Sequence, residues 1–159
     1  YVPGDHYKSA EELIHLLVKI VSRGGNFLLN IGPGPDGDWD PVAYQRLEEI
    51  GRWMKGNDIG IYESRPLAPY SSDNIYFTQH KDGKTWYAYY LNDSTGRPLP
   101  GQVVLKNLVV PRGSKISLPG GAISLKWKAE NGNTLISLPP SVNDRIDTRY
   151  ALVFRIQLP

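Results

Sequence analysis

Three aspartates alternate with other residues in one short segment, at Asp36, Asp38 and Asp40. Alternating carboxylates also begin the calcium loop of an EF-hand, which needs glycine at its sixth position and glutamate at its twelfth. Those positions hold Pro41 and Leu47 here, so the EF-hand interpretation fails. A looser calcium site stays open as an alternative, but turn formation and helix capping explain these aspartates more simply.

The segment just before them, Gly32–Gly37, formally matches the GxGxxG pattern of nucleotide-binding loops. Its two prolines, Pro33 and Pro35, remove amide donors that would hold a phosphate, and Asp36 would repel one. The pattern therefore predicts a tight turn rather than a nucleotide site.

The other reactive side chains do not form a recognisable catalytic or metal-binding motif. The chain has no cysteine, no HExxH and no GxSxG motif, and its glutamate pairs are neighbours that point about 100° apart on a helix. The histidines are scattered, at His6, His15 and His80. We therefore expect no metal site and no cofactor.

Aromatic residues are the better candidates for ligand contact. Trp39 follows an apolar run and a turn, and an indole there could stack on the apolar face of a sugar. Tyr1 and Tyr7 flank the preceding loop, which also carries His6.

Residues 1–63 must position these side chains, and their pattern is helix, strand, helix. Ser9 and Glu12 form a predicted capping box before an amphipathic helix. The apolar run Phe27–Ile31 predicts a strand that is covered on both faces, as in a parallel sheet. Asp40 then caps a second helix with Pro41 at its first position, and the predicted apolar face of this helix is Tyr44, Leu47, Ile50 and Met54. A lone strand cannot satisfy its own backbone groups, so we expect Phe27–Ile31 to have unpaired edges or to borrow partners from another chain.

From about residue 70 the pattern changes to period two, with turns rich in glycine, proline, asparagine and aspartate. This spacing predicts an antiparallel β-sandwich over residues 64–159. The predicted strands are Ile75–Gln79, Thr85–Leu91, Val103–Val110, Lys115–Leu118, Ile123–Lys128, Thr134–Leu138 and Tyr150–Leu158. The expected fold class is α/β plus all-β, with the last α-β-α elements of a (β/α)8-like barrel in residues 1–63.

Charge and hydropathy exclude two classes of partner. The 159 residues carry 18 basic and 16 acidic side chains, a net charge of +2, and the densest basic stretch is Lys126–Lys128. Nucleic-acid binding needs clustered cations, and a membrane span needs an apolar run of roughly 18 residues, so neither is expected. The chain begins at Tyr1 without an initiator Met, which suggests a fragment. Its compartment stays unknown, and a secreted, periplasmic or lysosomal-type setting would suit the parent protein.

Several motifs in order resemble the α-L-fucosidases of glycoside hydrolase family 29. They are Tyr7–Ile14, Gly24–Pro33, Pro35–Gly37, Ile50–Met54, Asn57, Ile61-Tyr62 and Arg65-Pro66. Two departures leave subgroup and linkage preference open: Asp58-Ile59-Gly60 stands where the family usually has Gly-Glu-Ala, and Trp39 occupies a commonly aliphatic position.

The resemblance implies a retaining enzyme that removes terminal α-L-fucose from glycans. In the family, the aspartate nucleophile and the acid/base glutamate precede the region that matches Tyr1, so no catalytic residue is assigned to this chain. The candidate substrate-binding residues are Trp39, Tyr1, His6 and Asn30. The expected partners are a fucosylated glycan or glycoside and the missing N-terminal part of the barrel, and this chain alone is expected to be inactive.

Two alternatives concern residues 64–159. They could form a carbohydrate-binding module, which would need an exposed, coplanar aromatic platform on one sheet. They could instead only brace the barrel, which the core-like alternation of their aromatics favours.

Overall fold

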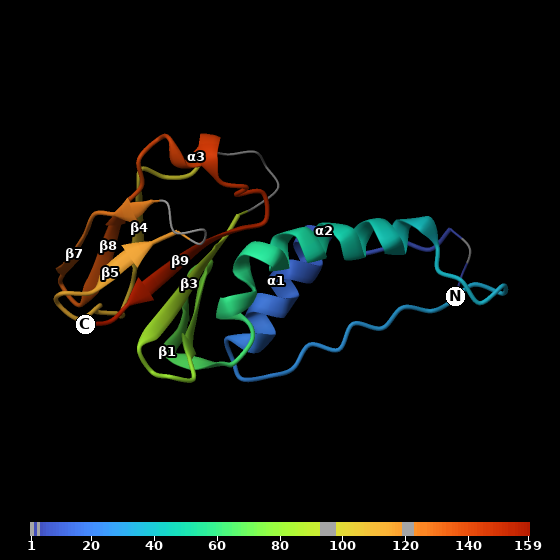
Figure 1. Ribbon diagram of the computed structural model, residues 1–159, viewed down its shortest axis with the longest axis horizontal. Coiled ribbons are helices and arrows are strands. Elements are labelled where there is room, and N and C mark those ends of the chain that lie inside the picture. Colours follow the sequence, from blue (N-terminus) through green and yellow to red (C-terminus); the bar gives the residue numbers. More distant parts are fainter. Residues whose placement is uncertain (1, 3, 93–97, 119–122) are drawn as a thin grey trace.

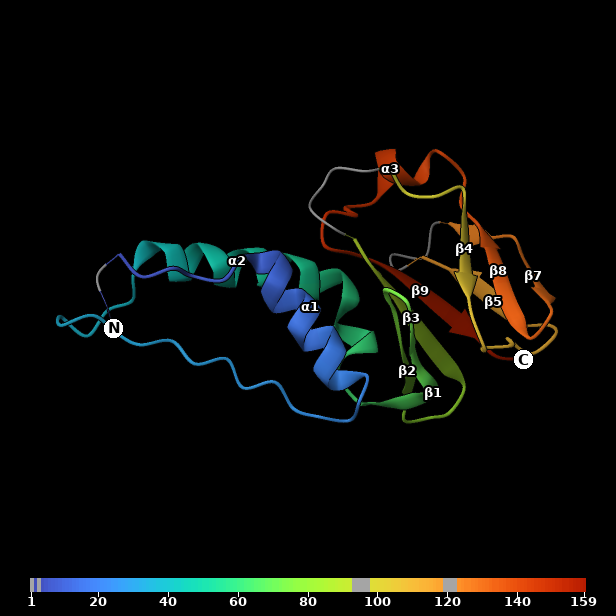
Figure 2. The same cartoon turned by 180° about the vertical axis from the view of Figure 1, so that it is seen from behind.

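The computed structural model describes residues 2, 4–92, 98–118 and 123–159. Two long helices, α1 (Ala10–Val21) and α2 (Pro41–Asn57), lie on one side of a six-stranded sheet, and a three-stranded sheet lies on its other side. Figures 1 and 2 show the helices beside the strands, with a long segment after α1 that runs back along α2 toward the N-terminus. Among the described helices, none is long and apolar enough to cross a membrane.

Helix α1 begins where the sequence predicts. The backbone N–H of Glu12 donates to Ser9 Oγ at 3.1 Å, and the backbone N–H of Ser9 donates to Glu12 Oε2 at 2.8 Å. This capping box satisfies two amide donors that the first turn leaves unpaired. Ile14 and Val18, one turn apart, are fully buried against the sheet.

Helix α2 also has its predicted start, because Asp40 Oδ1 accepts from the backbone N–H of Val42 at 2.9 Å. Its buried side chains are Ala43 and Trp53, whereas Tyr44, expected on the apolar face, is 46% exposed. That part of the predicted face is wrong: the helix contacts the rest of the chain mainly through its C-terminal half, and Tyr44 lies in the first turn. A short 3₁₀ helix, η1 (Asp58–Gly60), follows directly.

Both sheets are antiparallel, as the period-two pattern predicts. The six-stranded sheet has the order β1-β2-β3-β9-β5-β6, and the three-stranded sheet has the order β4-β8-β7. The strands are β1 (Ser64–Ser72), β2 (Ile75–His80), β3 (Thr85–Leu91), β4 (Gln102–Leu105), β5 (Lys115–Ser117), β6 (Ser124–Leu125), β7 (Trp127–Glu130), β8 (Asn133–Ser137) and β9 (Ala151–Gln157). A short helix, α3 (Val142–Arg145), precedes β9.

The central strands β3 and β9 are covered on both faces. Tyr87 and Tyr89 of β3 and Val153 of β9 pack against α1, α2 and η1. Ala88 and Phe154 point the other way, into the core shared with the three-stranded sheet. This double burial explains why both strands read as almost continuous apolar runs.

Two predicted strands differ from the structure by more than one residue at an end, and one observed strand was not predicted. The one expected over Val103–Val110 ends at Leu105, because Asn107 adopts a positive φ of 57° that a continuous strand does not accommodate. The one expected over Ile123–Lys128 is divided into β6 and β7. Strand β1, whose two prolines remove ladder donors, is absent from the sequence-based set.

The strand predicted over Phe27–Ile31 is not formed, and this prediction is wrong for the chain as it stands. No β-ladder pairs this segment with any described strand. A strand needs neighbouring strands to pair its backbone donors and acceptors, and the described chain places none beside this segment. The unpaired edges expected for this segment are therefore found.

Candidate functional site

A cavity of about 420 Å³ lies between α1, the first half of α2 and the segment 27–32. Its floor is apolar and its mouth carries polar side chains. The lining residues are Val2, Asp5, His6, Tyr7, Lys8, Leu13, Leu16, Phe27, Leu29, Asn30, Ile31, Gly32, Ala43, Arg46 and Leu47.

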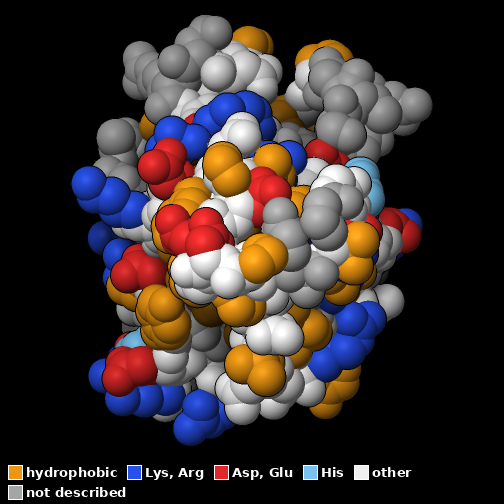
Figure 3. All heavy atoms as spheres, turned by 90° about the vertical axis from the view of Figure 1, so that its right-hand side faces the viewer, with side chains coloured by type: hydrophobic (Ala, Val, Ile, Leu, Met, Phe, Trp, Pro, Cys, Tyr) orange, Lys and Arg blue, Asp and Glu red, His pale blue; other side chains and the backbone are white. Residues whose placement is uncertain are grey.

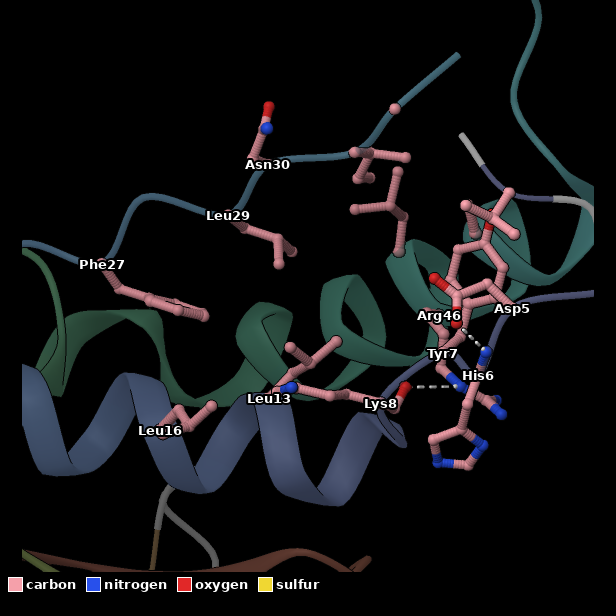
Figure 4. A pocket seen from close by; sticks show the side chains of 15 residues that line it. Asp5, His6, Tyr7, Lys8, Leu13, Leu16, Phe27, Leu29, Asn30 and Arg46 are labelled. Carbon is pink, nitrogen blue, oxygen red and sulfur yellow. Dashed lines mark hydrogen bonds between the residues drawn. The ribbon is translucent and has the colours of Figure 1, made fainter. Parts of the chain in front are cut away.

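Side chains of the segment 27–32 alternate between two sides, although the segment is not a strand. Figure 4 shows Phe27 and Leu29 directed toward the helices and Asn30 directed away from them. Leu28 is 90% exposed and is absent from the cavity lining. The segment therefore keeps the two-sided character of a strand, with one apolar side on the helices and the other side uncovered.

The mouth of the cavity is held by polar contacts around His6. The backbone N–H of His6 donates to Asp5 Oδ1 at 2.8 Å, and Arg46 Nε of α2 donates to the Lys8 carbonyl at 3.2 Å. Arg46 also pairs with Glu49 at 3.0 Å. The His6 ring points away from the segment that carries Asn30 (Figure 4). His6 and Asn30, two of the candidate residues, thus both line the cavity, but their side chains do not point toward each other.

Trp39 lies elsewhere, beside a shallow hollow of about 380 Å³. The hollow is formed by the turn that the GxGxxG-like segment makes. Gly37, with a φ of 86°, donates its N–H to the Gly34 carbonyl at 3.0 Å, and Gly34 donates to the Asp38 carbonyl at 2.7 Å. The turn interpretation of this motif is confirmed.

The Asp38 carboxylate organises the end of this turn. Its Oδ1 accepts from the backbone N–H of Trp39 at 2.8 Å and from the Tyr44 hydroxyl at 2.5 Å. The hydrogen bond from Tyr44 and then that from Trp39 lower the pKa of Asp38 below its usual range, and the same contact raises the pKa of Tyr44. Sequence reasoning overlooked this pairing; its available signal was an aspartate next to the helix cap with a tyrosine in the first helical turn.

Tyr1 lies outside the described residues. Among the described histidines, aspartates and glutamates, no three come together in a way that could hold a metal ion. His15 and His80 have contacts away from this region: His15 Nε2 donates to the Tyr150 carbonyl at 2.8 Å, and His80 lies between the Glu63 and Asp82 carboxylates. Figure 3, seen from the end that carries the N-terminus, shows hydrophobic side chains interspersed with acidic ones.

Comparison with known proteins gives one consistent result. Residues 1–58 match the family model described as alpha-L-fucosidase. Over 158 residues, 95% of its length, the chain is 30% identical to an alpha-L-fucosidase of Branchiostoma floridae. It is also 32% identical over 149 residues, 91% of its length, to the tissue alpha-L-fucosidase of Homo sapiens. The chain spans about a third of the length of these relatives, namely 33% and 31%.

Solved structures agree with the sequence matches. The Thermotoga maritima alpha-fucosidase in complex with fucose superposes with a TM-score of 0.83 at 25% identity, over 98% of this chain and 36% of that one. The same enzyme with a mechanism-based inhibitor gives a TM-score of 0.82 at 25% identity, over 96% of this chain and 35% of that one. The resemblance read from the motifs is thereby confirmed, and the chain is a relative of the α-L-fucosidases.

Proposed function

We propose that this chain is the C-terminal part of a retaining α-L-fucosidase that hydrolyses terminal α-L-fucose from glycans. Residues 1–63 would be the end of its (β/α)8-like catalytic barrel, and residues 64–159 its β-sandwich domain. The observation that carries the proposal is 30% sequence identity, over 95% of this chain, to an α-L-fucosidase of which the chain spans only 33%.

The segment 27–31 supports the barrel half of this proposal. In a (β/α)8 barrel each strand packs one side on the outer helices and directs the other into the barrel interior. Phe27 and Leu29 face α1 and α2, and Asn30 faces away from them (Figure 4). Leu28 is 90% exposed and lies outside the cavity lining. A neighbouring barrel strand on each side would supply the backbone partners that the segment lacks, and the barrel core would cover Leu28.

The chemistry requires groups that this chain does not provide. In a retaining glycosidase one carboxylate attacks the anomeric carbon and forms a glycosyl ester, while a second carboxylic acid protonates the departing oxygen. Water then cleaves the ester, and the second carboxylate accepts the water's proton. The two carboxyl groups are about 5–5.5 Å apart, and we assign both to the part of the enzyme that precedes Tyr1.

The contribution of this chain is to close the barrel and to shape the substrate site. Asn30 would present its amide on the interior side of the last strand, near its carboxyl end, where active sites of such barrels lie. His6 and Tyr1 would belong to the loop before α1, and Trp39 to the loop after the strand. Each would contact substrate rather than take part in bond cleavage.

The bracing role suits residues 64–159 better than a carbohydrate-binding role. A binding platform needs coplanar exposed aromatic rings on one sheet. Among the described aromatics that are exposed, only Tyr70 belongs to a strand, and the tyrosines at 87 and 89 are buried against the helices.

Turnover of the purified 159-residue chain tests the proposal. We expect no hydrolysis of 4-nitrophenyl α-L-fucoside above background, because one barrel segment cannot hold an acid and a nucleophile on opposite sides of one anomeric carbon. Asp36→Asn, which removes a carboxylate from the turn that follows residues 27–31, serves as the control for catalysis by this chain. Clear activity that disappears in Asp36→Asn would show that the catalytic carboxylates lie in this chain after all.

A further inference from the structure

We infer that Asp38 and Tyr44 are positioning residues that hold Trp39 as a fixed, exposed ring for a sugar residue beyond the fucose. The inference rests on the proposed function and adds the residues that determine preference for extended glycans. Asp38 and Tyr44 are not proposed to touch the reacting atoms.

The first support is the double role of one carboxylate oxygen. Asp38 Oδ1 accepts from the backbone N–H of Trp39 at 2.8 Å and from the Tyr44 hydroxyl at 2.5 Å. The backbone at Trp39 and the side chain from the first turn of α2 are therefore joined through a single atom. Hydrogen bonds to a charged acceptor are among the stronger ones in proteins, so this junction restrains the loop.

The second support is the contact between the two rings. The ring centroids of Trp39 and Tyr44 are 5.6 Å apart at an interplanar angle of 49°. The two residues are 39% and 46% exposed, respectively, so neither is absorbed into the core. Tyr44 thus braces the indole from one side and leaves part of it open to solvent.

The third support is the rigidity of the base on which the pair stands. Asp40 caps α2, because its Oδ1 accepts from the backbone N–H of Val42 at 2.9 Å. Pro41 occupies the first helical turn with its fixed φ. Trp39 is consequently held between a capped helix and a hydrogen-bonded turn. A ring that is ordered before binding loses less conformational freedom when a ligand arrives.

The ligand chemistry follows from the hollow beside the ring. It measures about 380 Å³ and is lined by Gly34, Pro35, Asp36, Asp38, Trp39, Asp40 and Pro41. An indole face beside a shallow, open depression suits the C–H face of a pyranose ring, whose hydroxyl groups stay hydrated. An anionic sugar would be repelled by the neighbouring carboxylates, so the ligand is a neutral hexose or N-acetylhexosamine residue of the glycan.

Nuclear magnetic resonance of the 159-residue chain tests the positioning role without any activity. The indole N–H signal of Trp39 is assigned by its loss in Trp39→Phe, and its heteronuclear NOE reports fast motion. Asp38→Ala should lower that NOE while the buried indole of Trp53 stays unchanged, and Asp38→Asn, which keeps an acceptor oxygen, should restore most of it. Tyr44→Phe, which removes the hydroxyl that donates to Asp38, should also lower the NOE, and Tyr62→Phe, at an exposed tyrosine elsewhere, is its control. An NOE that Asp38→Ala leaves unaltered would overturn the positioning role.

Kinetics then test the consequence for substrate choice. The enzyme is a chimaera in which residues 1–159 replace the matching segment of the Thermotoga maritima α-fucosidase. Trp39→Ala and Asp38→Ala should each reduce kcat/KM for a fucosylated trisaccharide by about tenfold through KM. The aryl fucoside should be affected by less than about twofold, and the double variant should be no worse than Trp39→Ala alone.

Equal losses on both substrates, or additive losses in the double variant, would refute the inference while leaving the proposed function intact. A folded chimaera that is inert on the aryl fucoside would instead refute the proposed function. In that case the sugar contact falls with it, and the NOE measurement alone decides whether Asp38 orders Trp39.

Discussion

The hydroxyl group of Tyr89 lies directly against the backbone of Gly60, in the space that a side chain at that position would occupy. Thr78 joins the two, since its Oγ1 donates to the Gly60 carbonyl at 3.0 Å and lies 3.3 Å from Tyr89 Oη. Burial raises the pKa of Tyr89, so this hydroxyl stays protonated and available as a donor. The end of α2 and η1 is thereby locked onto the six-stranded sheet.

This contact predicts a strong effect of Gly60→Ala. The added methyl group would meet the Tyr89 hydroxyl and lie 3.0 Å from two atoms of the Tyr87 ring. We expect the free energy of unfolding to fall by about 1–3 kcal/mol, measured by urea denaturation. Gly51→Ala is the matched control, because that glycine lies within α2 with open space around it, and alanine there should stabilise by about 0.5–1 kcal/mol. A neutral Gly60→Ala would contradict the packing described.

Thr134 supports a second prediction. Its buried hydroxyl donates to the Leu108 carbonyl at 2.8 Å and accepts from the backbone N–H of Val110 at 2.9 Å. Thr134→Val keeps the shape but leaves both backbone groups without this partner, which should cost about 1–3 kcal/mol in unfolding free energy. Thr134→Ser retains the hydroxyl and should lose much less. A larger loss in Thr134→Ser than in Thr134→Val would mean that the methyl group, not the hydrogen bonds, matters.

Leu28 distinguishes the isolated chain from the assembled barrel. Because it is 90% exposed here, Leu28→Asp should change the unfolding free energy of the 159-residue chain by less than about 0.5 kcal/mol. In the chimaera the same carboxylate would enter the barrel core, so soluble yield and activity should both collapse. Val109→Asp, at a residue that is 51% exposed, should be tolerated in both proteins. Full activity of the Leu28→Asp chimaera would argue against a barrel around this segment.

Acid should destabilise the chain through several carboxylates. Hydrogen bonds lower the pKa of three carboxyl groups. The main donor is the Ser9 backbone for Glu12, the Tyr44 hydroxyl for Asp38 and the Lys81 side chain for Glu63. A lowered pKa in the folded state contributes stability that is present above the unfolded value, about 4, and is lost as the pH falls through the folded value.

The urea midpoint should therefore be level near neutral pH and fall in acid, below about pH 4. Glu12→Gln should flatten part of that fall, whereas Glu48→Gln, at an exposed position of α2, should leave the profile unchanged. A midpoint that rises on acidification would contradict the sign of these shifts.

Local signals in the sequence predicted much of the fold. The capping box at Ser9 and the cap at Asp40 depend on residues close in sequence, and both helices begin where predicted. Strand β3 has its predicted limits, Thr85–Leu91, because both of its faces are buried.

The predictions that failed concern features set by long-range contacts or by special backbone conformations. Strand β1 combines prolines, a register shift and a positive φ at Tyr70, none of which the period-two pattern can reveal. The segment at 27–31 has the composition of a strand but no partner in the described chain, and pairing is not encoded by composition. For the site, residue types singled out Trp39, but the junction at Asp38 Oδ1 depends on a three-dimensional turn.

The most direct test of the central claim is fucoside hydrolysis by the chimaera that carries residues 1–159 in the Thermotoga maritima α-fucosidase. If this chain completes an α-L-fucosidase barrel, the chimaera should hydrolyse 4-nitrophenyl α-L-fucoside, while the 159-residue chain and the truncated bacterial segment should each be inactive alone. A chimaera that unfolds cooperatively, and so is folded, yet neither hydrolyses the fucoside nor binds fucose would contradict the claim.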